Sequence, residues 1–379
     1  MIDQNIGIYI HIPFCVKKCN YCDFVSGAFD DSFKEEYINR LCREIEDISL
    51  DYKSFNADSI FVGGGTPSIL SEKLTSKLFD TLYKCFNVSS NAEITTEANP
   101  GTLNLDKLKL YKSIGVNRLS IGLQSTNDNE LRILGRIHTY NDFLENYECA
   151  RNAGFENINV DLMSALPGQK VDSFVDSLNN VLKLSPEHIS VYSLIIEEGT
   201  PFYNMNLDLP DEDDERKMVH VIPEILGTIY SQYEISNYAK RGMECRHNIK
   251  YWKREPYLGF GPSAASLTYS NSSIIPDLRY KNTSDIRNYT FSNEIIHDEY
   301  EILTYDDMMS EYMFLGLRMN CGIKYSDFQR IFNKNINEVF GKAVFKHVEE
   351  GLLIIDKDRL FLSETGRDLS NYVFADFLM

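Results

Sequence analysis

Three cysteines near the N-terminus have a spacing that suits an iron–sulfur centre. Cys15, Cys19 and Cys22 form a C-x3-C-x2-C pattern directly after a short apolar run. Three thiolates on one loop can hold three irons of a [4Fe–4S] cluster, so the fourth iron stays open to a small chelating molecule. The alternatives are a zinc site completed by His11 or another histidine, and a chance group of buried thiols. Structural zinc sites usually combine two ligand pairs, and this sequence has no second pair.

Downstream segments add groups that can surround a ligand. FVGGGTPS (61–68) has three glycines, which allow the backbone to approach a ligand closely, although a tight turn between a strand and a helix also explains them. It is not a phosphate-binding P-loop, because the Gly-Lys-Ser/Thr ending is missing. Glu97, Gln124, Arg136 and Asp161 stand at or near the ends of later strands, where α/β proteins collect their ligands. Of these four residues, only Asp161 lies within an apolar run, which predicts that its carboxylate is buried. A buried carboxylate needs a partner.

The segment YIHIPFCVKKCNYCDF, together with these motifs, resembles the radical SAM superfamily, and within it the coproporphyrinogen dehydrogenase-like branch of HemN and HemW. The resemblance extends from Tyr9 to the C-terminal helices. It implies that S-adenosylmethionine (SAM) chelates the open iron and that an electron from the cluster cleaves SAM to methionine and a 5′-deoxyadenosyl radical. By the same resemblance, the SAM site consists of Gly64, Gly65 and Thr66 at the methionine end, Glu97 and Asp161 at the adenosine or ribose, Arg136 at the carboxylate, and Gln124, Tyr9 and Tyr21 as further lining.

Two features favour the HemW side of this branch. The dehydrogenase pattern places another cysteine two residues after the third, where this chain has Phe24. The run HNIKYW resembles the haem-binding H-N-x-x-Y-W motif of HemW. A neutral His247 can ligate haem iron, Tyr251 and Trp252 offer flat faces to a porphyrin, and Asn248 can bond a propionate or orient the histidine. An ordinary helix start with a hydrogen-bonded histidine is the alternative interpretation.

The resemblance therefore implies a haem chaperone that carries a [4Fe–4S] cluster, binds SAM and haem, and transfers haem to client haem proteins such as respiratory enzymes. No catalytic residue is assigned under this interpretation. The first alternative is an oxygen-independent coproporphyrinogen III dehydrogenase, in which the radical takes a hydrogen from a propionate side chain. A zinc-stabilised interaction protein is the third class considered.

The elements that must position these residues alternate between strand and helix patterns. Apolar, β-rich runs predict strands at 7–12, 58–63, 92–97, 117–122, 157–163 and 188–194. Helical patterns lie between them, near 31–50, 70–86, 104–114, 140–153 and 171–184. Such alternation predicts a parallel sheet with helices on its faces. Six units are too few for a closed eight-stranded barrel, so the expected α/β fold is an incomplete (β/α)6 barrel.

The sequence predicts three regions. Residues 1–208 form the partial barrel, 209–297 form a connecting region that carries the HNIKYW run, and 298–379 form a smaller, mostly helical domain. The connecting region is expected to contain a helix near 214–230 and one strand at 232–238. The helices after 298 and a predicted hairpin at 353–363 resemble a winged-helix module.

The composition limits the partners and the location. The 379 residues carry a net charge of −18, and an acidic surface repels phosphate backbones, so we expect no nucleic-acid partner. The sequence has no transmembrane run and its start lacks the pattern of a signal peptide. A cytoplasmic location, where thiols stay reduced, follows as the expectation.

Overall fold

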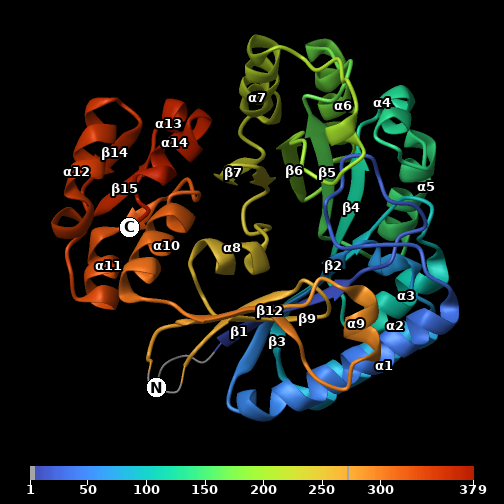
Figure 1. Cartoon of the computed structure of the whole chain (residues 1–379). Coiled ribbons are helices and arrows are strands. Elements are labelled where there is room, and N and C mark those ends of the chain that lie inside the picture. The colour runs from blue at the N-terminus through green and yellow to red at the C-terminus, as the bar shows by residue number, and fades with distance from the viewer. Residues whose placement is uncertain (1–4, 271–272) are drawn as a thin grey trace.

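The computed structural model describes residues 5–270 and 273–379, and these residues build one sheet of twelve strands and a second sheet of three. The middle of the large sheet is six parallel neighbours in chain order (Figure 1). Their bounds are β1 (Asn5–Ile12), β2 (Asn56–Gly64), β3 (Asn87–Ala98), β4 (Arg118–Gln124), β5 (Ile158–Ser164) and β6 (His188–Ser193). The predicted incomplete barrel of six units is confirmed.

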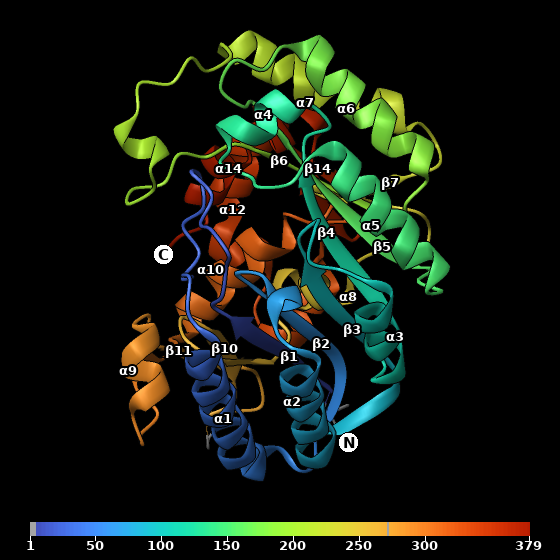
Figure 2. The same cartoon turned by 90° about the vertical axis from the view of Figure 1, so that its right-hand side faces the viewer.

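Helices cover the outer side of these strands (Figure 2). They are α1 (Asp31–Ile48), α2 (Glu72–Cys85), α3 (Leu105–Ser113), α4 (Asp128–Ile133), α5 (Tyr140–Asn152) and α6 (Val171–Leu184). The first two begin at side-chain caps, since Asp30 accepts from the amide of Phe33 and Ser71 from that of Leu74. Because helices cover one face and the lumen the other, a central strand such as β4 is buried at six of its seven positions.

The edge beyond β6 differs from the prediction. Helix α7 (Glu212–Leu226) is present where a helix was expected, but the single strand predicted at 232–238 is wrong. Two short antiparallel strands, β7 (Ser231–Glu234) and β8 (Asn237–Ala239), occupy this stretch. The chain reverses between them because the Glu234 carboxylate accepts a hydrogen bond from the amide of Ser236 at 2.9 Å, which favours a turn.

The opposite edge was not predicted at all. Strand β9 (Tyr257–Phe260) pairs parallel with β1, and β10 (Ala265–Thr268), β11 (Leu278–Asn282) and β12 (His297–Ile302) continue the sheet antiparallel. Residues 298–302, where we expected the helical region to begin, therefore belong to the large sheet. Helix α8 (Arg246–Trp252) precedes β9, and helix α9 (Ile286–Phe291) lies between β11 and β12 in the chain. Helix α8 lies on the inner side of the sheet, between β2 and the C-terminal elements (Figure 1).

The C-terminal elements form their own core around Met313, Phe328 and Phe340. They are α10 (Tyr305–Gly316), β13 (Ile323–Lys324), α11 (Tyr325–Phe332), α12 (Ile336–Glu349), β14 (Leu353–Asp356), β15 (Arg359–Leu362), α13 (Glu364–Asp368) and α14 (Ser370–Ala375). The helices and the β14–β15 hairpin agree with the expected winged-helix-like order. The region boundaries at 208 and 297 stay predictions. Along the described chain, no helix has the length and apolar character needed to cross a bilayer.

Candidate functional site

The three thiols face one cavity at the carboxyl ends of the central strands. Their loop is closed at its base, because Cys15 and Gly27 donate backbone hydrogen bonds to Gly27 and Pro13, both at 2.9 Å. Cys15, Cys19 and Cys22 are partly exposed and free of disulfides. They line a cavity of about 140 Å³, which we call the cysteine cavity. Its other walls include the predicted SAM residues Tyr21, Gly64, Gly65, Thr66, Glu97, Gln124, Arg136 and Asp161.

The cysteine loop offers three thiols, and the histidine that the zinc alternative named as the fourth ligand has other partners. Arg136 donates to the Cys19 sulfur at 3.7 Å, and burial raises the pKa of Cys22 to about 11, so a metal must displace that proton. His11, the possible zinc ligand, uses its nitrogens on Tyr9 and on the Val25 carbonyl, at 3.0 and 2.8 Å. Within residues 5–270 and 273–379, no three His, Cys, Asp or Glu side chains gather as a metal site, so the thiols converge without forming a closed cage.

The glycine segment is shaped by its contacts with the loop before the cysteines and with β3. Gly64 has φ of +111°, and its amide donates to the Glu97 carboxylate at 3.0 Å. A Cβ on Gly64 would lie 2.6 Å from the His11 ring, so only glycine fits there. The segment therefore fixes Glu97 at the boundary of the cysteine cavity.

Arg136 and Thr66 are linked by a residue that the sequence analysis missed. Asn99 accepts from Arg136 at 2.7 Å and donates to the Thr66 hydroxyl at 2.8 Å. Arg136 also donates to the Gly122 carbonyl. Asn99 follows Glu97 by two positions, and its place just beyond the third predicted strand was the available signal. Gln124, with a non-glycine φ of +74°, ends β4 in a strained conformation beside this group.

A second cavity of about 210 Å³ adjoins the first inside the barrel, and we call it the lumen cavity. It shares Phe24, Gly64, Glu97, Ser120 and Asp161 with the cysteine cavity. Burial raises the pKa of Glu97 to about 8 and also raises that of Asp161. The remaining walls include Tyr9 from the predicted SAM set, His247, Asn248 and Tyr251 from the HNIKYW run, and Arg118, Asn159, Ser190 and Tyr192, which the sequence analysis did not select.

The HNIKYW run is divided between two surroundings. His247 is 1% exposed, and its nitrogens contact the Ser59 hydroxyl at 2.9 Å and the Tyr251 hydroxyl at 2.8 Å. Burial lowers its pKa to about 3, so the ring is neutral. Trp252 does not line the lumen cavity. Its ring is covered by the Arg318 guanidinium, whose carbon lies 4.3 Å from the ring centroid. His247 and Trp252 therefore do not face one cavity.

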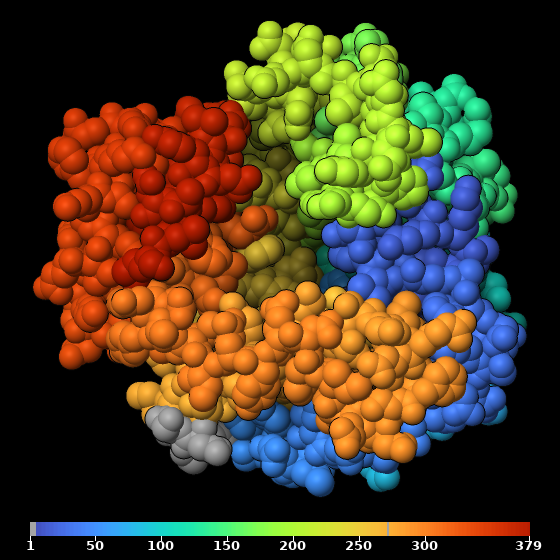
Figure 3. Space-filling model, viewed as in Figure 1, coloured from blue at the N-terminus to red at the C-terminus, as the bar shows by residue number. Residues whose placement is uncertain are grey.

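Two further features describe the surface. Figure 3 shows the face hollowed at its centre, between the blue N-terminal segment, the yellow-green segment after β6 and the orange and red C-terminal part.

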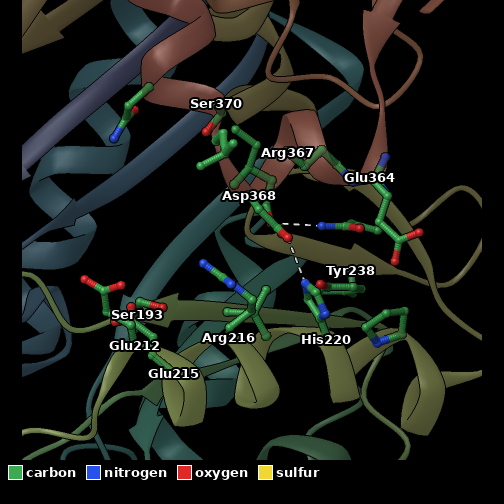
Figure 4. Close-up of a pocket in the computed structure, with 16 residues that line it drawn as sticks. Ser193, Glu212, Glu215, Arg216, His220, Tyr238, Glu364, Arg367, Asp368 and Ser370 are labelled. Atoms are coloured by element: carbon green, nitrogen blue, oxygen red, sulfur yellow. Dashed lines mark hydrogen bonds and ion pairs between the residues drawn. The ribbon is translucent and has the colours of Figure 1, made fainter. Parts of the chain in front are cut away.

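A separate cavity of about 430 Å³ lies between α7 and the helices α13 and α14. There His220 Nε2 and the Asp368 carboxylate are hydrogen-bonded at 2.8 Å (Figure 4). None of the three cysteines lines this third cavity.

Comparisons with known proteins agree with this geometry. The family model described as the radical SAM superfamily matches residues 9–181, and the model of the HemN C-terminal domain matches residues 303–369. The heme chaperone HemW of Bacillus subtilis is 37% identical over 98% of both chains. That of Lactococcus lactis is 33% identical over 100% of this chain and 99% of its own. The solved structure of coproporphyrinogen III oxidase (HemN) from Escherichia coli has a TM-score of 0.86 at 24% identity, covering 99% of this chain and 90% of that one.

Proposed function

Because the chain belongs to the HemW family of radical SAM proteins, we propose that it is a cytoplasmic haem chaperone that binds SAM and delivers haem to client haem proteins. The observation that carries this proposal is the junction of two cavities. One cavity collects the three thiols, and the adjoining one contains His247, Asn248 and Tyr251. Phe24 lines both, at the position where the dehydrogenase pattern has a further cysteine.

In this proposal Cys15, Cys19 and Cys22 hold a [4Fe–4S] cluster, which supplies the electron that cleaves SAM. Arg136 is positioned for the SAM carboxylate, since it projects into the cysteine cavity beside Cys19. Glu97 lies between the two cavities and can accept hydrogen bonds from a ribose. The remaining proposed SAM contacts are Tyr9, Tyr21, Gly64, Gly65, Thr66, Gln124 and Asp161.

Haem binding requires a local rearrangement of α8. His247 is neutral, so its lone pair can serve iron, but one of its hydrogen bonds to Ser59 or Tyr251 must first open. Asn248 and Tyr251 line the same cavity and are proposed haem contacts. Trp252 joins them only if it leaves Arg318.

The first experiment tests the cluster. Anaerobically purified and reconstituted chain should be brown, with iron and sulfide near four per chain if one cluster is filled. The triple variant with Cys15, Cys19 and Cys22 changed to serine should stay colourless. A wild-type chain that retains zinc and no sulfide under these conditions contradicts the proposal.

The second experiment tests haem. His247→Ala should weaken haem binding and change its absorption spectrum, whereas His220→Ala, at a histidine of the α7 cavity, should leave both unchanged. The reverse result would assign haem to the α7 cavity. Conversion of coproporphyrinogen III to protoporphyrinogen IX by the reconstituted chain would instead favour the dehydrogenase alternative.

A further inference from the structure

Arg118 is a buried cation without a partner. It is 2% exposed, and across the described chain its guanidinium makes no hydrogen bond and no ion pair; its Nε is a buried donor left unsatisfied. Buried guanidinium groups are normally paired, because removing the charge and its five donors from water is costly. The environment of Arg118 therefore needs an explanation.

The orientation of Arg118 follows from its strand. It is the first residue of β4, and side chains two apart on a strand share a face. Ser120, Gly122 and Gln124 of the same strand line the cysteine cavity, and both Arg118 and Ser120 line the lumen cavity. The guanidinium thus faces the inside of the barrel.

Neighbouring acidic and polar groups are already engaged. Glu93 accepts hydrogen bonds from the amides of Arg246 and His247, both at 3.1 Å. Asp161 accepts from Asn159 at 2.7 Å and from Ser120 at 3.3 Å. Both carboxylates attract Arg118 through space, but neither comes within ion-pair distance. The donors of Arg118 are therefore left to a ligand.

Two other cations near the barrel interior already have protein partners in this structure, whereas Lys17 and Lys18 on the cysteine cavity are exposed. Arg136 bonds Asn99 and the Gly122 carbonyl. Lys250 pairs with Asp58 at 2.9 Å and Glu255 at 3.2 Å. Among the described residues that line the lumen cavity, Arg118 is the one lysine or arginine, and its hydrogen-bonding capacity is free.

The free donors suit a carboxylate. A planar guanidinium matches a carboxylate in a two-point fork, and the nearby Glu93 and Asp161 disfavour a dianion such as phosphate. The lumen cavity, at about 210 Å³, is smaller than typical pockets for whole drug-sized ligands, so it accepts a side arm of a larger molecule. Tyr192 and Phe24 line it and are 42% and 59% exposed, so the cavity reaches solvent.

Resting on the proposed haem function, we propose that Arg118 binds a propionate carboxylate of haem whose arm enters the lumen cavity. Haem carries carboxylates on flexible side arms, which match both the charge and the size of this cavity. SAM is the other source of a carboxylate, and the experiment separates the two.

The test compares haem with its dimethyl ester on the full-length chain under anaerobic conditions. Wild type should bind haem about 10- to 150-fold more tightly than the ester, as expected for a charged hydrogen-bonded contact. Arg118→Met should abolish this preference and Arg118→Lys should retain part of it. Arg246→Met, at an exposed arginine of α8 outside the lumen, is the matched control and should behave as wild type.

Several outcomes overturn the proposal. Equal wild-type affinity for haem and ester does so without any variant, and thus without any risk of misfolding. A folded Arg118→Met protein that still prefers haem to its dimethyl ester also overturns the proposal. If Arg118→Met weakens only SAM binding, the carboxylate that Arg118 binds belongs to SAM, and the proposal is overturned. A wild-type chain that binds neither haem nor ester refutes the haem chaperone function itself.

Discussion

Replacing Gly65 by alanine should disturb the cysteine loop through direct backbone contact. A Cβ on Gly65 would lie 2.7 Å from the Phe14 oxygen, 2.9 Å from the Phe14 nitrogen and 3.0 Å from the Ile12 oxygen. These atoms belong to the end of β1 and the residue before Cys15, so they cannot rotate away as a side chain would. Overpacking of this kind costs about 1–3 kcal/mol. To relieve these contacts the backbone of Phe14 must move. Because Cys15 is the next residue, it should move too and widen the cysteine cavity.

Two measurements check this reasoning. Urea unfolding of the metal-free Gly65→Ala protein should give a free energy of unfolding lower by about 1–3 kcal/mol, and the reconstituted protein should bind SAM more weakly. Gly341→Ala in α12 is the control, because its nearest neighbour atom is 3.9 Å away and alanine favours helix by up to about 1 kcal/mol. A Gly65→Ala protein with wild-type stability and SAM affinity refutes the argument.

Three further predictions concern buried and exposed charges. Arg254→Met should lower the free energy of unfolding by about 1–3 kcal/mol in urea, because it removes a 2.8 Å partner from the buried Glu311, which keeps Arg279 as its second partner; no measurable loss contradicts this. The raised pKa of Glu97 means that the folded chain keeps a proton that the unfolded chain has released, so stability falls as pH rises from about 4.5 to about 8. Glu97→Gln should flatten that part of the profile, and an unchanged slope would exclude Glu97 as its cause. His220→Ala should cost less than about 1 kcal/mol, since its hydrogen-bonded contact with Asp368 is partly exposed; a larger loss in thermal or urea unfolding argues against a surface pair.

The central fold could be predicted because its signals are local. Each parallel strand is buried on two sides, so it appears in the sequence as a short, mostly apolar run such as residues 7–12. The edge strands β9 to β12 give no such signal. The segment YLGFGPSAASLT contains glycines and a proline, and its strand character depends on pairing with β1, far away in the sequence.

The candidate site was predictable where chemistry and position coincide. The cysteines and Asp161 are unusual for their places in the sequence, so they stand out. Arg118 does not, because a charged residue at the start of a strand normally ends in solvent, whereas the folded chain buries this one near Glu93 and Asp161. The position of Trp252 depends likewise on Arg318, which comes from a different part of the chain.

The pairing of β9 with β1 also bears on the order of events during synthesis. Gly7 pairs with Tyr257, so the strand that leads into the cysteine loop lacks one neighbour until about 250 further residues have left the ribosome. At roughly 5–20 residues per second, this interval is on the order of tens of seconds. Such a long sequence separation also slows folding, because loop closure precedes any gain from the contact. Strand β1 is thus exposed as an unfinished sheet edge while translation continues, and assembly of the proposed cluster is expected to follow the pairing of β9 with β1.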